Sequence, residues 1–263
     1  MQGMGIKNMD KTATHPSGLT VEFNDENHTY IVKQTGQRLT SVTTFIGAFF
    51  PKFDTDTVAA KCVGKPKYKG LSADEIKQAW ADESLRGRTE GTHVHFYAEC
   101  LLNGNFKDIP APQSDREKLL FQQALLAVMR LEERFAFVGT EVIVFSPRLG
   151  IAGMIDLLMF DTRDAFDLII LDWKQNKEIS TSNKYESAFS PIEHLSACDY
   201  HKYALQLNLY EKIIREEGYY KFPGFAGVRK ALVHLKPDAH PIIKIETGGY
   251  QRDLDTMIES VPF

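Results

Sequence analysis

The stretch AFDLIILDWK, residues 165–174, decides the fold class. Its apolar run, Leu168–Leu171, is continuous, which is typical of a strand buried on both faces of a sheet. The run ends abruptly at Asp172-Trp173-Lys174. Because side chains alternate along a strand, Asp172 and Lys174 point to the same side. A charge at the end of a buried strand is costly unless it is paired or binds a metal. The stretch therefore predicts a central strand that ends in two charged side chains.

Two further β-like runs come directly before it, TEVIVFS (140–146) and GIAGMIDLLMF (150–160). The turns between the three runs are short, which favours an antiparallel meander. Asp156 lies inside the second run, where a lone acid is expensive. A hairpin would bring Asp156 and Asp172 within reach of one ion, and hard cations prefer such oxygen ligands. Alone, the Asp-x-Lys pattern would indicate only a surface ion pair.

Helical and β-like patterns flank this meander. Ser114 with Glu117 forms a capping box that starts an amphipathic helix over 114–135. The other expected elements are β-rich residues 19–46, helical pieces over 54–85 broken at 64–70, a glycine-bracketed helix within 86–104, a helix over 199–218, strands at 227–235 and 241–246, and a helix near 250–258. This order predicts an α/β fold, with a central mixed β-sheet flanked by helices. We expect a flexible N-terminal leader at 1–18 and a single domain at 19–263.

The composition is that of an ordinary globular protein, with 43% hydrophobic and 25% charged residues in 263. No run approaches the roughly 20 apolar residues that span a bilayer, and residues 1–18 do not resemble a signal peptide. We therefore expect a cytoplasmic or other intracellular protein that does not bind membranes. The net charge of −4 neither suggests nor excludes nucleic acid. The spacing of Cys62, Cys100 and Cys198 supports neither a zinc site nor an iron–sulfur cluster.

Two helices offer further candidates for the site. His95 and Glu99 are four residues apart and therefore share one helical face. Imidazole tolerates Mn²⁺ better than Mg²⁺. His93 lies about 200° around the helix from His95, so only one of the two can share the site. Gln206 and Tyr210 are also four apart, and the alternative for them is a half-buried amphipathic face.

These residue types fit phosphodiester hydrolysis. A divalent cation held by Asp156 and Asp172 would lower the pKa of a water and neutralise charge on a phosphate. Lys174 would position or help to deprotonate that water, or stabilise the phosphate in the transition state.

The ordered set of motifs resembles the RecB-like branch of the PD-(D/E)XK nuclease superfamily. The residues that carry the resemblance are Gly91, His95 and Glu99, then Gly153, Ile155 and Asp156, then Asp172-Trp173-Lys174, then Gln206 and Tyr210. With TSVTT at 40–44, the similarity covers about residues 40–215. Within that branch, the chain resembles the mitochondrial genome maintenance exonucleases and related phage exonucleases. The resemblance implies a restriction-endonuclease-like core.

The resemblance also implies roles for particular residues. The metal ligands would be His95, Asp156, Asp172 and the backbone carbonyl of Trp173, holding Mg²⁺ or Mn²⁺. Lys174 would be catalytic together with Asp156 and Asp172. Glu99, Glu141, Gln206 and Tyr210 would support the site. Some RecB-like proteins carry cysteines for an iron–sulfur cluster, but the three cysteines here do not fit that pattern, so none is expected.

The expected partner is DNA, single-stranded or with free ends, contacted by Thr43, Arg86, Arg88 and Lys177. Lys65, Lys67, Lys69 and Lys184 are further candidates beside Tyr68, Tyr97 and Tyr185, although such charges are often only solvated. We expect an exonuclease that acts in replication, repair or recombination, with proteins of those processes as further partners. One setting is a phage-encoded enzyme that acts in the host cytoplasm. The alternatives are a structure-specific endonuclease and a protein that binds nucleic acid without cutting it.

Overall fold

A computed structural model describes residues 11–161, 167–221, 227–236, 242–246 and 248–261. They form a mixed sheet in the order β1-β2-β3-β4-β6-β7-β8-β9, with β5 paired to β6 off this path. The strands are β1 (Lys11–Thr14), β2 (Thr20–Asn24), β3 (Thr29–Val32), β4 (Arg38–Ser41), β5 (Ala136–Ser146), β6 (Ile151–Asp161), β7 (Asp167–Lys174), β8 (Val228–His234) and β9 (Ile242–Lys244). The fold is thus α/β with a mixed sheet, as predicted.

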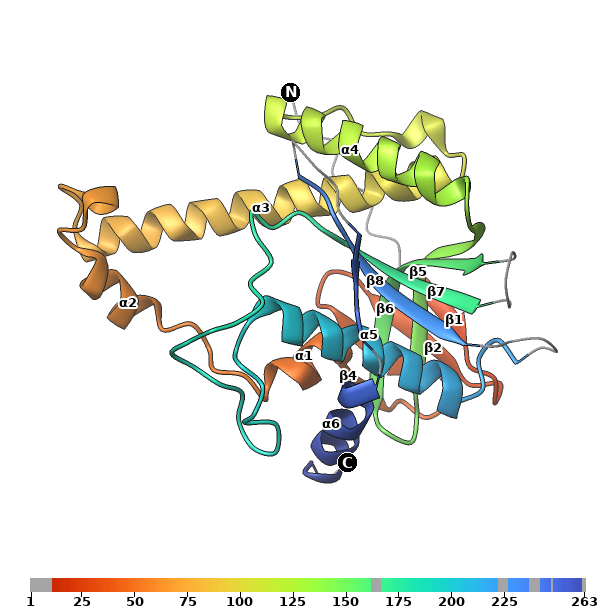
Figure 1. Cartoon of the computed structure of the whole chain (residues 1–263). Helices are drawn as coiled ribbons and strands as arrows, with labels where there is room; N and C mark the ends of the chain where they lie inside the picture. Colours follow the sequence, from red (N-terminus) through yellow and green to blue (C-terminus); the bar gives the residue numbers. More distant parts are fainter. Residues whose placement is uncertain (1–10, 162–166, 222–226, 237–241, 247, 262–263) are drawn as a thin grey trace.

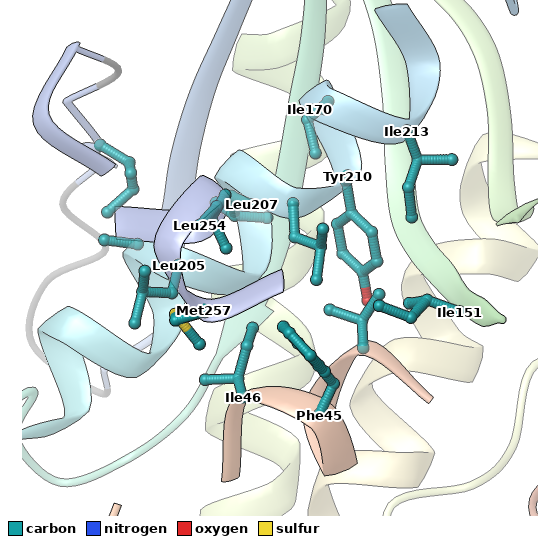
Figure 2. Packing of buried hydrophobic residues seen from close by; sticks show 14 of the residues in the cluster. Phe45, Ile46, Ile151, Ile170, Leu205, Leu207, Tyr210, Ile213, Leu254 and Met257 are labelled. Atoms are coloured by element: carbon teal, nitrogen blue, oxygen red, sulfur yellow. The ribbon is translucent and has the colours of Figure 1, made fainter. Parts of the chain in front are cut away.

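Helices cover both faces of the sheet (Figure 1). They are α1 (Val42–Gly47), α2 (Thr55–Cys62), α3 (Ala73–Leu102), α4 (Asp115–Glu132), α5 (Asp199–Glu216) and α6 (Gly248–Glu259), with short 3₁₀ turns η1 (Pro66–Tyr68) and η2 (Phe106–Asp108). One buried cluster joins α1, α5 and α6 to the sheet, and Figure 2 shows its packing around Tyr210. A second joins α3 and α4 to the opposite face. The central strands β6 and β7 are consequently buried on both sides.

The three-strand meander β5-β6-β7 is antiparallel, as predicted, and the side-chain phase of β6 changes near Asp156. Ile155 packs in the cluster on the α5 side, and so does Leu158, three positions later. Strict alternation would place these two residues on opposite faces. The side-chain phase of β6 therefore shifts between them, although the β5–β6 register is continuous from Gly139 to Ser146 and shifts between Phe137 and Gly139 instead.

Strand β6 also has an incomplete edge beside Asp156. Its start pairs with β4 through Ile151 and Ala152, and its second half pairs with β7 from Leu157 onward. The residues between these two ladders pair with neither strand on that edge. This gap leaves room for side chains from the helices above and below the sheet.

Two expectations about the chain before the meander were wrong. Of the glycines that we expected to bracket a separate helix, Gly87 and Gly91 lie inside α3, which runs unbroken for 30 residues, whereas Gly104 follows its end, as expected. Its N-terminus does carry the expected capping box, Ser72 with Glu75. Residues 11–14, assigned to a flexible leader, form β1 and pair with β2, and a turn over 15–18 joins the two strands. The rest of that leader, 1–10, lies outside the described residues.

Candidate metal centre

Three carboxylates lie in line across the three strands of the meander. The pairs Thr140–Leu157 and Val142–Ile155 flank Glu141 and Asp156, so these two acids lie opposite each other. Asp172 directly follows the last β6–β7 pair, Leu157–Leu171, and is thus opposite Asp156 from the other side. Glu141 has a φ of 50°, a left-handed conformation that is uncommon outside glycine and that often marks functional sites.

His95 completes a cluster with two of these acids. Ligand atoms of His95, Glu141 and Asp156 all lie within 4.8 Å of one another. His95 Nδ1 is 3.5 Å from Asp156 Oδ2. The backbone N–H of Trp173 donates to the same Asp156 oxygen at 2.9 Å, and the Trp173 carbonyl accepts a hydrogen bond from the His95 ring. This carbonyl therefore borders the cluster, at the position where we expected a metal ligand.

Burial and mutual repulsion disturb the titration of these groups. Burial, followed by the charge of Asp172, raises the pKa of Asp156 to about 8. Burial, followed by the charge of Asp156, raises the pKa of Glu141 to about 7. Burial and the nearby Lys174 lower the pKa of His95, so its ring is neutral and able to act as a ligand at neutral pH. The cluster thus offers two carboxylates that are costly to ionise and one neutral imidazole.

This donor set fits a divalent cation. Two facing carboxylates that are partly buried repel each other when both are ionised, and a cation between them would remove that cost. Oxygen ligands suit Mg²⁺, and the added imidazole suits Mn²⁺. The ligand set differs from the expected one at one position. Glu141, named only as a supporting acid, lies in the cluster, whereas Asp172 does not.

Asp172 instead holds Lys174, with which it forms an ion pair. Gln206 Nε2 donates to Asp172 Oδ1 at 3.2 Å and lies 3.3 Å from the Tyr210 hydroxyl. The charges of Asp172 and Asp156 raise the pKa of Lys174 although burial acts to lower it. Lys174 is therefore protonated at neutral pH and acts as a cation and a hydrogen-bond donor. Its Nζ lies 4.5 Å above the ring of Tyr203.

The predicted supporting pair on α5 connects this ion pair to β6. The hydroxyl of Tyr210 donates to the carbonyl of Met154 at 3.0 Å. Its ring lies against Gly153, where an added Cβ would be 2.5 Å from Tyr210 Cε1 and 2.9 Å from Val42 Cγ2. Gly153 thus lets α5 approach the strand closely enough for Gln206 and Tyr210 to reach the site.

Replacing Gly153 with alanine is expected to lower the free energy of unfolding by about 1–3 kcal/mol, because the buried Tyr210 ring cannot give way without displacing its neighbours. Urea denaturation would measure the change. Gly47→Ala in α1 is the matched control, since an added Cβ there meets nothing within 4 Å. Equal stability of the Gly153 variant and the wild type would refute this role for the glycine.

The second motif glycine, Gly91, has a similar role on α3. An added Cβ at Gly91 would lie 2.4 Å from Gln175 Nε2, which donates to the Gly87 carbonyl at 2.8 Å. Gln175 follows Lys174, so the end of β7 rests directly on the helix that carries His95. His93 points away from the centre, as predicted, and its Nδ1 lies 2.6 Å from Glu117 on α4.

Lys11 is a candidate that sequence reasoning missed. Its Nζ lies 3.4 Å from Glu141 Oε2, and it borders the same cavity as His95 and Asp156. The sequence does carry a hairpin pattern there, because the runs KTAT and LTVEF flank the turn residues HPSG. We expected a flexible leader instead, because residues 1–18 contain no long apolar run. Glu99 lines this cavity of about 330 Å³ too.

A second cavity, of about 570 Å³, adjoins the first at Thr92 and His95. Three of the four predicted DNA contacts line it, namely Arg86, Arg88 and Lys177, together with Lys174. Thr43 is not among its lining residues. It is exposed on α1, where its hydroxyl lies 3.1 Å from that of Ser41.

The cysteines lie apart from the centre. Cys62, Cys100 and Cys198 are free and buried on α2, on α3 and directly before α5. No helix in the described part of the chain is both long and apolar enough to cross a bilayer.

Comparisons with known proteins add little to this geometry. No protein-family model matches the chain, and no curated protein does. Among solved structures, the crystal structure of SSO0001 is similar over 64% of this chain and 85% of its own, with 15% identity and a TM-score of 0.23. A likeness this weak carries no part of the argument.

Proposed function

We propose that this protein is a metal-dependent nuclease that hydrolyses DNA phosphodiester bonds. The observation that carries the proposal is the convergence of His95, Glu141 and Asp156 next to the Asp172–Lys174 ion pair. An ion pair with a purely structural role does not require a group of partly buried acids beside it. A basic cavity that opens beside His95 supports a polyanionic substrate.

The residues divide into two groups by chemistry. His95, Glu141 and Asp156, with the Trp173 carbonyl, would hold Mg²⁺ or Mn²⁺, which when bound supplies charge neutralisation at the phosphate and lowers the pKa of a water. Lys174 donates hydrogen bonds to the attacking water or to a phosphate oxygen. Asp172 orients Lys174 and keeps it charged, and Gln206 and Tyr210 fix Asp172 against β6.

Within this proposal we favour an exonuclease acting on single strands or DNA ends, in replication, repair or recombination. A structure-specific endonuclease on the same core is the second candidate. A protein that only binds nucleic acid is disfavoured, because binding requires neither Lys174 nor the acid cluster. An intracellular location follows if the substrate is cellular or phage DNA.

We expect activity to require a divalent cation, with Mn²⁺ at least as effective as Mg²⁺ because His95 is among the ligands. The test is digestion of end-labelled single-stranded, duplex, flapped and circular DNA, with RNA as a control. Release of mononucleotides or short products from ends, with circles intact, indicates an exonuclease, whereas cut circles indicate an endonuclease. Undiminished cleavage in excess EDTA would refute the metal requirement.

A further inference from the structure

An arm extends from the body of the protein, away from the sheet (Figure 1). It consists of α2, η1 and the N-terminal half of α3. Ala59, Cys62 and Ile76 form a small buried cluster there, distinct from the clusters around the sheet. Tyr68 and Trp80 pack against that cluster. The arm therefore has its own core, and substitutions on its surface leave the metal centre intact.

The tip of the arm is strongly basic. No acid occurs between Asp56 and Asp74, whereas four lysines do: Lys61, Lys65, Lys67 and Lys69, all exposed. Asp56 and Asp74 are each paired with Lys77 at 2.8 Å. None of the four lysines has an ion-pair partner within the described residues. Their charges remain available to an anionic ligand.

Aromatic rings lie beside these lysines. Phe53 is 65% exposed, and its ring centroid is 5.7 Å from that of Trp80. Trp80 in turn contacts Tyr68 edge-on and donates from Nε1 to its hydroxyl at 3.0 Å. Exposed aromatic rings interleaved with cations are the surface that binds unpaired bases and their phosphates.

One face of α3 connects the arm to the metal centre. The residues on this stripe recur at spacings of four, three, four and four: Trp80, Ser84, Gly87, Gly91 and His95. This spacing keeps them on one side of a helix. From Ser84 to His95 they line the basic cavity that also holds Arg86, Arg88 and Lys177. The arm's aromatic rings and the candidate ligand His95 thus lie along one face of α3, on which the Gln175 side chain rests at Gly87 and Gly91.

We propose that this surface, from Phe53 and the arm lysines to His95, is a track for a single strand of DNA that leads to the metal centre. The inference rests on the proposed function. Fifteen residues separate Trp80 from His95, which is about 22 Å along a helix. At 3.4 Å per nucleotide, a strand needs roughly six or seven nucleotides to reach the arm from the centre.

The test is binding of oligothymidylates of 4, 8, 12 and 16 nucleotides and of a 16-base-pair duplex. Fluorescence anisotropy in EDTA measures binding without cleavage. The first variant carries Lys65→Ala, Lys67→Ala and Lys69→Ala, and the second carries Phe53→Ala. A matched control replaces three exposed lysines of the body, Lys107, Lys118 and Lys244, with alanine.

For the 12-mer, we expect the arm-lysine variant to bind at least tenfold more weakly than the wild type. The slope of log affinity against log salt should become shallower by about 2, since each lost contact to a single strand contributes about 0.7. Phe53→Ala should weaken binding of the 12-mer about tenfold. The 4-mer, too short to span the track, should bind all variants alike, and the control should match the wild type.

Wild-type binding of the 12-mer by the arm-lysine variant would overturn the proposal, as would an equal loss on the duplex. Because the assay contains no metal, its outcome is separate from that of the proposed function. A wild-type protein that binds the 12-mer through the arm but cuts nothing with Mn²⁺ would refute the nuclease and leave the track in place.

Discussion

Replacing Asp156 with asparagine is expected to abolish cleavage and to remove the rise in Tm that Mn²⁺ gives to the wild type. Asp156 faces both Glu141 and Asp172 across the sheet, and it shares its Oδ2 between His95 and the Trp173 amide. A cation that binds only the folded state stabilises it by mass action, so loss of the ligand removes the shift. Thermal melting of both proteins with and without millimolar Mn²⁺ measures this shift in Tm.

The same variant should change how stability depends on pH without metal. The raised pKa values of Asp156 and Glu141 mean that each carboxyl binds its proton more tightly in the folded state than in the unfolded state. That contribution is complete below the unfolded pKa and is lost as pH rises through about 7 to 8. Metal-free wild type should therefore melt at a lower temperature at pH 9 than at pH 6. In Asp156→Asn this decrease should be smaller, and an unchanged decrease would count against the buried acid pair.

Replacing Lys174 with methionine is expected to reduce cleavage by at least 100-fold while DNA binding in EDTA remains within about threefold. A single preorganised donor at the reacting group contributes about 3 kcal/mol or more to transition-state stabilisation. The change should also destabilise the fold by on the order of 3 kcal/mol, because it leaves the buried Asp172 without its partner.

A second substitution separates these two effects. Adding Asp172→Asn to Lys174→Met removes the unpaired charge, so the double variant should regain stability but not activity. Wild-type turnover by either variant would refute the assignment of Lys174. Recovery of activity along with stability would show that Lys174 serves the fold and not the reaction.

The parts of the site that local patterns specify were predictable. The apolar run ending in Asp172-Trp173-Lys174 indicates a buried strand, and the short turns before it predict the antiparallel pairing of β5, β6 and β7. The spacing of His95 from His93 shows that only one of the two can face the sheet. These inferences need only the period of a helix or a strand.

The remaining parts depend on how distant segments meet. Glu141 enters the cluster because β5 pairs with β6 in one register and because its own φ is positive, and neither feature is encoded locally. Gly87 and Gly91 read as helix boundaries, but both lie inside α3, where the side chain of Gln175, the residue after β7, contacts the helix. Lys11 reaches Glu141 only through a hairpin at the start of the chain.

The most direct test of the central claim is digestion of an end-labelled single-stranded oligonucleotide in Mn²⁺ by the wild type, Glu141→Gln and Asp156→Asn. Glu141→Gln is the sharpest variant, because this residue enters the cluster through the fold and not through the motifs. We expect cleavage by the wild type that EDTA abolishes, and no detectable cleavage by either variant while both remain folded. Cleavage by Glu141→Gln at the wild-type rate, or by the wild type in EDTA, would contradict the proposal that these residues hold a catalytic metal ion.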